Sequence, residues 1–430
     1  MLLVYTQKNT HRINYVFKHI FFRILGVEIG FTSVIEDFIS HEGPKLSYGK
    51  QPLGNELFFQ SQGLLNQQGF ESFDITVKEW DETKCFFSVS EKSALPFDIF
   101  AASFYLLSRY EEYLPHLKDE KGRFPASESL GYKEKFLKQP VVDIWAYKLK
   151  EILTSNFPFL EMPVRSISIH NLINAQEPFA FIHKGFLRSL VGYISDLSHF
   201  RIKKLFQRSK VLLGLRPDPY QTFNWIIDTI KKSNTKLSIF FILGESIKFI
   251  EGINSKKKYF KRLIKIIADY REVGLMFSKD SLSDFSILKK EKKQMESINN
   301  RNLISSMSAN YMVELPDNYR DLVELEVECD YTMVYEDTIG FRSGTCTPFL
   351  FYDLDYEILT PLTIHSNALT SSSLYEKDQS DISKIIDELY NSVNSVNGTF
   401  SMIFSNKDFS PLPENTIWID VFTRKLQQYD

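Results

Sequence analysis

The sequence predicts an α/β fold in which a parallel sheet is preceded by a mixed α+β N-terminal domain. The chain has 430 residues, which is more than one small domain holds. Its composition, 43% hydrophobic and 24% charged, is that of an ordinary globular protein. After Pro217, amphipathic helical patterns alternate with continuous apolar segments. This alternation favours a parallel sheet, either open or closed into a barrel.

The N-terminal part mixes strand-like and helical segments. Residues 1–5 (MLLVY) indicate a short strand, and residues 9–25 carry apolar side chains three and four positions apart, which predicts a helix. A second helix is expected over 98–113, because Pro96 precedes its first turn and Pro115 ends it. The charged residues near its end are interpreted as a solvated terminus, and they are Arg109, Glu111 and Glu112.

The second part begins after the two prolines of residues 157–164 (FPFLEMPV), so we expect domains at 1–160 and 165–430. The expected strands cover residues 165–169, 237–243, 272–276, 331–335, 359–365 and 399–404. The expected helices cover residues 186–206, 223–231, 259–270, 282–298 and 382–393. In parallel barrels the chemistry takes place at the carboxyl ends of the strands.

The charge balance argues against a nucleic-acid partner. The 51 Lys and Arg against 54 Asp and Glu give a net charge of -3, whereas nucleic-acid binding favours a basic surface. The basic stretch 201–210 (RIKKLFQRSK) is interpreted as a solvated helix face rather than a membrane or nucleic-acid patch. No apolar run approaches the roughly 18 residues of a membrane span, and the N-terminus carries no secretory signal, so we expect a cytoplasmic protein.

Cysteine and histidine are too scattered for a local metal site. The three Cys form no CxxC pair, which makes a disulfide framework or a zinc ribbon improbable. No two of the eight His stand at the spacing of roughly three to five residues that puts both rings on one helical face. A metal site would therefore have to be assembled from residues far apart in the chain.

The most informative segment is the loop 340–353 (GFRSGTCTPFLFYD), which follows a predicted strand. Such a loop can project the Arg342 guanidinium and backbone N–H groups into a cleft that holds a carboxylate or a polarised carbonyl. The alternative is a tight turn in which Arg342 pairs with a buried carboxylate. The alternating acids of 353–357 are interpreted as solvated or capping groups rather than metal ligands, and they are Asp353, Asp355 and Glu357.

Several strings resemble a bacterial branch of the polysaccharide deacetylases that carries an extra N-terminal domain. In the second half these are 340–354, 330–333 (DYTM), 272–275 (EVGL) and 316–322 (PDNYRDL). In the first half they are 48–50 (YGK), 95–115 (LPFDIFAASFYLLSRYEEYLP), 122–126 (GRFPA) and 142–145 (VDIW). The resemblance covers nearly the whole chain and implies a distorted (β/α) barrel from about residue 165 onward.

The resemblance also implies a chemistry that this sequence does not retain. Family members use one Asp as base, an Asp and two His as ligands of a divalent metal whose water attacks an N-acetyl carbonyl, and a late His as acid. At the matching positions, fixed by strings such as 179–185 (FAFIHKG), this chain has Asn174, Gln176, Met276, Asn310 and Ser405. The loop arginine is retained as Arg342, while its family partner, a carboxylate, is missing.

These replacements predict a protein without hydrolytic activity and without a metal cofactor. Amides are poor bases, a thioether is too soft for such a metal, and a hydroxyl cannot replace imidazole as a proton donor. We expect a retained cleft that binds an N-acetylated glycan or a glycan-assembly protein. The candidate groove residues are Arg342, Tyr311, Phe349 and Tyr352.

Two alternatives stay open. One is a divergent metal-dependent carbohydrate N-deacetylase, a hydrolase of C–N amide bonds other than peptide bonds, which holds a divalent metal such as zinc in a rebuilt site. His170, close before Asn174, or the acids Glu272 and Asp280, which flank Met276, would supply that site. The other is that the N-terminal domain carries the function and the barrel supports it.

Overall fold

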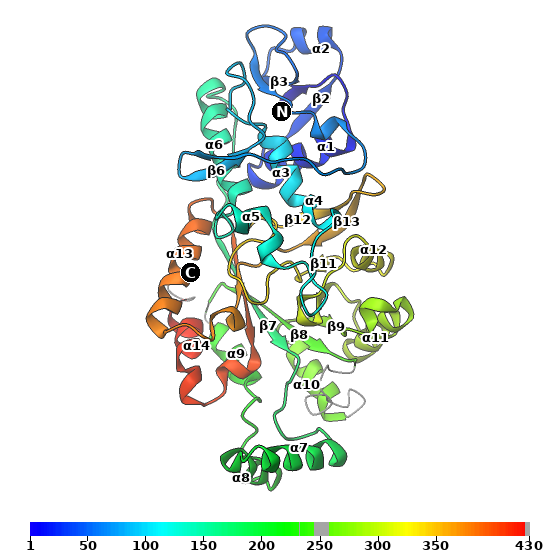
Figure 1. The fold of residues 1–430 in the computed structure, drawn as a ribbon, viewed down its shortest axis with the longest axis vertical. Helices are drawn as coiled ribbons and strands as arrows, with labels where there is room; N and C mark the ends of the chain where they lie inside the picture. The colour runs from blue at the N-terminus through cyan, green and yellow to red at the C-terminus, as the bar shows by residue number, and fades with distance from the viewer. Residues whose placement is uncertain (232, 245–257, 426–430) are drawn as a thin grey trace.

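A computed structural model describes residues 1–231, 233–244 and 258–425 (Figure 1). The N-terminal part lies at one end of an elongated molecule, a large sheet occupies the middle, and a helical hairpin forms the other end (Figure 1). Among the described helices, none combines the length and the apolar character that crossing a bilayer requires.

The N-terminal part is built on a four-stranded parallel sheet with the strand order β2-β1-β3-β4. Its strands and the adjacent hairpin are β1 (Leu2–Tyr5), β2 (Ile29–Thr32), β3 (Lys45–Gly49), β4 (Leu57–Gln60), β5 (Val77–Trp80) and β6 (Thr83–Phe86). The helices are α1 (His11–Phe17), α2 (Ile35–Ser40), α3 (Ile99–Leu107), α4 (Tyr110–Tyr113), α5 (Leu130–Lys133) and α6 (Val141–Asn156). The Asp98 carboxylate caps α3 by accepting from the Ala101 N–H at 3.0 Å, which explains why this helix begins where the sequence predicts.

The second part is built on a nine-stranded sheet with the order β12-β13-β11-β10-β9-β8-β7-β15-β14. All its neighbours pair in parallel except β12 and β13. The strands are β7 (Ser168–Ala175), β8 (Lys236–Ile242), β9 (Glu272–Phe277), β10 (Ser305–Ser308), β11 (Cys329–Asp330), β12 (Phe349–Asp353), β13 (Ile358–Ile364), β14 (Leu369–Thr370) and β15 (Thr399–Ser405). The helices are α7 (Phe186–Ser198), α8 (Ile202–Leu212), α9 (Phe223–Ile230), α10 (Lys258–Ala268), α11 (Phe285–Asn299), α12 (Asp317–Glu324), α13 (Gln379–Asn394) and α14 (Thr416–Asp420).

This sheet is strongly curled. The ring of His170 in β7 lies 6.3 Å from the ring of His365, which follows β13, although five strand-to-strand steps separate the two strands. In a flat sheet those steps would span about 24 Å. The concave side holds an apolar cluster that includes Leu172, Met276 and Tyr311. Between β12 and β14, the two ends of the order, the described residues form no strand pairing, so the parallel sheet is confirmed and its closure into a barrel stays a prediction.

Four predicted elements differ from the structure. The expected strand over 165–169 is β7, which starts three residues later and extends to Ala175. The expected helix over 98–113 is divided into α3 and α4 at Arg109, which has a left-handed φ of 53°.

The expected strand over 331–335 does not form. The short strand β11 ends before it, because the Asp330 carboxylate accepts from the Thr332 N–H at 2.9 Å and from its hydroxyl at 2.8 Å. These local bonds compete with a strand ladder and turn the chain. The expected helix over 186–206 is two helices, α7 and α8, which meet at Phe200 with a left-handed φ of 52°.

The two parts share polar contacts as well as one continuous apolar core. Asp143 in α6 accepts from the Thr345 hydroxyl at 2.5 Å, the Cys346 N–H at 3.0 Å and Arg165 at 3.0 Å. Arg12 in α1 pairs with Glu357, one of the acids interpreted as solvated. Arg320 holds the other two, Asp353 and Asp355. The N-terminal part therefore packs against the segment 340–357, which contains β12.

Candidate functional site

The carboxyl ends of β7 and β15 bring several of the predicted site positions together. Asn174 and Ser405 are register partners across these two strands. The Asn174 side-chain amide donates to the Tyr311 hydroxyl at 3.2 Å, and its Oδ1 accepts from the Gln176 N–H at 3.1 Å. Met276 is fully buried in the apolar cluster that also contains Tyr311. Neutral groups that already bond to one another thus occupy this end of the sheet.

Ser405 has a structural role at the start of a 3-10 turn over Asn406–Phe409. Its hydroxyl accepts from the Lys407 N–H at 3.3 Å, and its own N–H donates to Asp408 Oδ2 at 2.8 Å, which together form a capping box. The Asn406 amide donates to the carbonyls of Glu177 and Tyr220, both at 3.0 Å. These contacts fix the chain at the carboxyl end of β15, and the Ser405 hydroxyl is already used as a hydrogen-bond acceptor.

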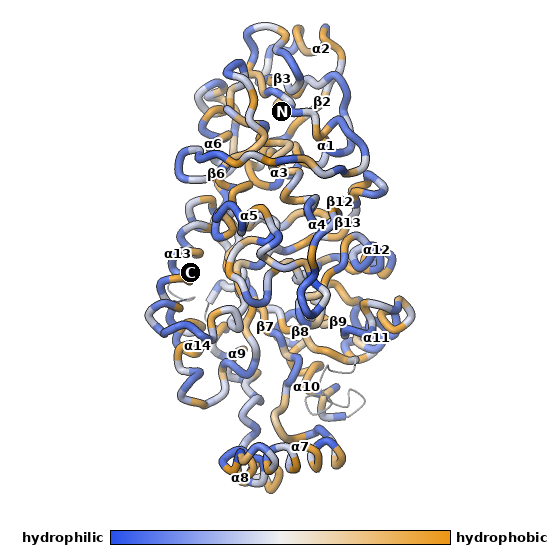
Figure 2. The backbone as a smooth tube through the Cα atoms, viewed as in Figure 1, coloured by the Kyte–Doolittle hydropathy of each residue, from blue (hydrophilic) through white to orange (hydrophobic). Residues whose placement is uncertain are grey.

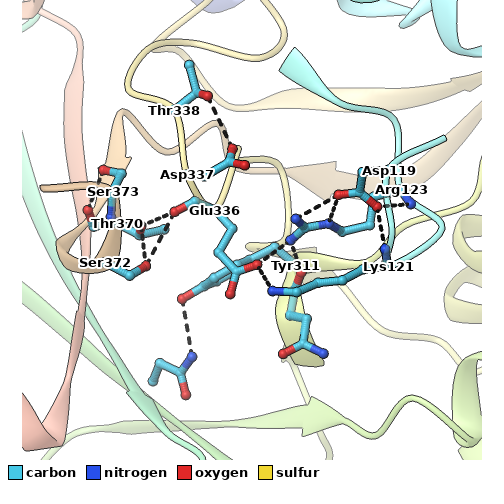
Figure 3. Close-up of polar contacts among 12 residues, drawn as sticks. Asp119, Lys121, Arg123, Tyr311, Glu336, Asp337, Thr338, Thr370, Ser372 and Ser373 are labelled. Atoms are coloured by element: carbon cyan, nitrogen blue, oxygen red, sulfur yellow. Dashed lines mark hydrogen bonds and ion pairs between the residues drawn. The ribbon is translucent and has the colours of Figure 1, made fainter. Parts of the chain in front are cut away.

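Arg123, from the N-terminal part, contacts the Asn310 backbone. It lies beside Asp119 and Glu336 (Figure 3). Its guanidinium donates to the Asn310 carbonyl at 2.8 Å and to Glu336 at 2.6 Å, while Asp119 accepts from it at 2.8 Å. Lys121 adds a second cation on Glu336 at 2.5 Å (Figure 3). The pocket beside these side chains has a volume of about 20 Å³, which is room for about one water molecule rather than a sugar ring. Sequence reasoning missed Arg123 because no local pattern relates it to residues almost two hundred positions away.

Arg342 pairs with a buried carboxylate supplied by the N-terminal part. Its Nε and Nη2 donate to the two oxygens of Glu112 at 2.9 and 2.6 Å, and Arg109 Nε donates to the same carboxylate at 2.8 Å. Arg109 also bonds to Glu111 at 2.8 Å and to the Arg342 carbonyl. The expectation of a solvated helix end at these residues is wrong, because the four side chains form one buried ion network.

Arg342 is committed to this network and is not open to a ligand. Burial alone would raise the pKa of Glu112, but the charges of Arg342 and Arg109 override it and lower that pKa to about 2. Arg342 is 3% exposed, and the Nε and Nη2 groups of its guanidinium already donate to Glu112. Glu112 is the buried carboxylate with which Arg342 pairs, so the tight-turn alternative describes the observed geometry.

Two of the four predicted groove residues lie in the core. Phe349 and Tyr352 are 2% and 1% exposed, and Tyr352 packs against the rings of Tyr15 and Phe104 at centroid distances of 5.1 and 5.2 Å. The prediction placed these rings in a groove, but the N-terminal part packs over β12 and buries them. Tyr311 does line the small pocket beside Arg123, together with Arg342.

No metal ligand set is assembled at the candidate site. Within the described ranges, no three His, Cys, Asp or Glu side chains are grouped so that they could hold a metal ion. His170 lies toward the amino end of β7, where its Nε2 is 2.8 Å from the Ser238 hydroxyl, which in turn donates to Glu272 at 2.5 Å. Asp280 precedes the 3-10 turn Ser281–Ser283 beyond β9 and makes no side-chain capping bond to it. The groups considered for a rebuilt site therefore do not meet Met276, and the residues present do not suit a divalent metal.

Two larger pockets lie beside the residues that follow Ser405 in the chain. One pocket of about 450 Å³ is lined by Tyr220, Tyr375 and Trp418, and by Lys407. Tyr375 is 53% exposed, and its hydroxyl donates to Asp408 at 2.6 Å. A second pocket of about 710 Å³ shares Tyr220 and Lys407 with the first. The aromatic residues come from three separate segments, so no spacing in the sequence could have grouped them.

Comparisons with known proteins give a family match for the N-terminal part and remote similarities to solved structures. Residues 2–158 match a family described as a family of unknown function, DUF7033. A solved structure of a putative polysaccharide deacetylase from Mycobacterium smegmatis is 9% identical, with a TM-score of 0.40, over 63% of this chain and 89% of that one. A CE4 family pseudoenzyme from Bacillus anthracis is 11% identical, with a TM-score of 0.28, over 61% of each chain. No curated protein matches this chain significantly.

Proposed function

We propose that this protein is a polysaccharide-deacetylase-like protein that acts by binding and does not hydrolyse its ligand. In this proposal residues 165–430 form a distorted (β/α) barrel and residues 1–160 form a cytoplasmic companion domain. The observation that carries the proposal is the side-chain content at the carboxyl ends of the strands. Asn174 is bonded to Tyr311, Met276 is buried, and Ser405 caps a turn. None of these groups can act as a base, hold a hard metal or deliver a proton as imidazole does.

The position of Arg123 supports the same proposal. An acetyl carbonyl must approach the catalytic groups within hydrogen-bond distance. Arg123 lines the small pocket of about 20 Å³ beside Tyr311, and its contacts to Glu336 and the Asn310 carbonyl hold it there. We therefore place the glycan-related cleft outside this small pocket, in the pocket of about 450 Å³ lined by Tyr220 and Tyr375. The exposed ring of Tyr375 offers an apolar face on which a sugar can stack.

Metal content and acetate release test the absence of hydrolysis. The purified full-length protein, incubated with zinc and then desalted, is expected to retain far less than one metal per chain and to release no acetate from N-acetylated chito-oligosaccharides. Elemental analysis and an enzymatic acetate assay measure the two quantities. Stoichiometric zinc together with acetate release that His170→Ala abolishes would instead establish the divergent hydrolase.

Glycan binding is measured separately, by titration calorimetry with the same oligosaccharides. We expect Tyr375→Ala to weaken binding about tenfold, because one stacked ring contributes on the order of 1 kcal/mol. Tyr356→Ala is the matched control, since this ring is also exposed but lies outside the described pockets. Equal effects of the two substitutions would contradict the placement of the cleft.

A further inference from the structure

The hairpin of α7 and α8 projects from the body of the molecule and carries a concentration of exposed apolar side chains. Both helices lie beyond the sheet, joined to it by the segments before α7 and after α8 (Figure 1). Eleven of the 31 exposed large apolar side chains among the described residues fall in the 30 residues from 186 to 215. The most exposed of them are Phe186, Leu187, Phe200, Phe206, Leu213 and Leu215. Apolar exposure at this density marks an interaction surface.

The interior of the hairpin is polar, which is the reverse of an ordinary helical hairpin. Arg208 in α8 donates to Asp196 in α7 through Nε at 2.9 Å and Nη2 at 2.7 Å, and both side chains are buried. The guanidinium lies over the Tyr193 ring at 5.5 Å. Gly192 admits it, because a Cβ at this position would collide with the guanidinium. The polar pair joins the helices, and many apolar side chains of both are exposed. Figure 2 shows apolar and polar residues mixed along the hairpin.

The same segment carries a strong positive charge. Residues 185–216 contain seven Lys and Arg and a single acid, Asp196, whereas the whole chain has a net charge of -3. Asp196 is already neutralised by Arg208. The exposed cations are Arg201, Lys203, Lys204, Lys210 and Arg216. The interpretation of 201–210 as a merely solvated face leaves the adjacent apolar side chains without a partner.

These properties together select one kind of partner. A second copy of the chain would bring two strongly positive surfaces into contact, which is electrostatically unfavourable. Nucleic acid would neutralise the cations but would leave the apolar side chains in water. An anionic bilayer satisfies both requirements, because lipid phosphates accept the lysines and arginines while Leu, Ile and Phe enter the boundary of the acyl chains.

We propose that the α7–α8 hairpin binds the surface of an anionic phospholipid bilayer, with its apolar side chains inserted below the headgroups and without crossing the membrane. The rest of the chain then stands away from the bilayer, because the hairpin is at one end of the molecule (Figure 1). This proposal does not depend on the glycan-binding function.

Vesicle flotation of the full-length protein tests the proposal. Vesicles of phosphatidylcholine with about 30% phosphatidylglycerol are expected to bind the protein at least tenfold more tightly than pure phosphatidylcholine, because each cation near an anionic surface contributes on the order of 1 kcal/mol. The preference should weaken as salt is added. The double substitution Lys203→Ala/Lys204→Ala should reduce it, whereas Lys289→Ala/Lys290→Ala on the exposed side of α11 should not.

The apolar contribution is tested by Ile194→Gln/Phe206→Gln, which we expect to lose binding to the anionic vesicles at least tenfold. The matched control is Ile35→Gln/Ile39→Gln, two exposed isoleucines of α2. Unchanged circular dichroism of all four variants is expected because the side chains are exposed. Absence of vesicle binding, equal binding to both kinds of vesicle, or a stable dimer that Ile194→Gln/Phe206→Gln dissociates would each overturn the proposal.

Discussion

Glu112→Ala is expected to lower the free energy of unfolding by about 3–5 kcal/mol, the range for removing one partner of a buried ion pair. The substitution takes both carboxylate bonds from Arg342 and one from Arg109, and it leaves two buried guanidinium groups with incomplete pairing. The loss comes mainly from this uncompensated charge rather than from the bonds themselves. Urea unfolding followed by circular dichroism measures it.

Glu314→Ala is the matched control for this substitution. Glu314 pairs with Lys118 at 2.7 Å, but both side chains are exposed, so its loss is expected to change stability by less than about 1 kcal/mol. The double variant Glu112→Leu/Arg342→Met should be more stable than Glu112→Ala, because it removes a charge together with its partner. Similar losses for Glu112→Ala and Glu314→Ala would show that the network contributes no more than a surface pair.

Acidification from pH 7 to pH 5 is expected to destabilise the protein by up to about 2 kcal/mol for each of three buried histidines. Burial lowers the pKa of His19 to about 3, of His170 to about 4 and of His365 to about 3. In the unfolded chain these rings titrate near pH 6.5. The stability that they contribute is therefore fully present above pH 6.5 and is lost as the pH falls toward the folded-state values, because only the unfolded chain takes up the protons.

His19→Phe separates this effect from general acid sensitivity. Neither ring nitrogen of His19 has a hydrogen-bond partner among the described residues, and the ring faces Phe349 at a centroid distance of 6.4 Å. We expect Phe to be accommodated at pH 7 and to reduce the slope of stability against pH between 6.5 and 5. His199→Gln, at an exposed position, should leave the slope unchanged. Thermal midpoints measured across this pH range provide the comparison, and parallel slopes for His19→Phe and the wild type would contradict the assignment.

Much of the fold could be predicted because its elements have strong local signals. The helices α10 and α13 follow apolar stripes, and the strands β8 and β15 are continuous apolar runs, so their positions agree with the sequence to within a few residues. The helix predicted over 9–25 is α1 followed by a π-helical segment, Lys18–Ile24. The predictions failed where side chains rather than periodicity decide the backbone. Asp330 turns the chain after two strand residues, and a left-handed Phe200 divides one predicted helix into two. Neither event changes the hydrophobic pattern.

The candidate site was predictable in position but not in its contacts. The matched positions Asn174 and Ser405 lie side by side, since strand ends can be located from apolar runs. The partners of the remaining groups could not be found, because Arg123 reaches Asn310 and Glu112 reaches Arg342 across sequence separations of 187 and 230 residues. A charged residue in a helix has the same local pattern whether it faces water or an arginine from another part of the chain.

The buried polar contacts between α7 and α8 affect the rate at which the hairpin can bind a partner surface. A segment that must fold as it binds loses chain entropy on contact, and its affinity is lowered by that loss. Here the bonds between Arg208 and Asp196 and between Tyr193 and Ser209, both at 2.9 Å, hold the two helices together before the hairpin meets a partner. Association should then be limited by diffusion and electrostatic attraction rather than by coil-to-helix conversion.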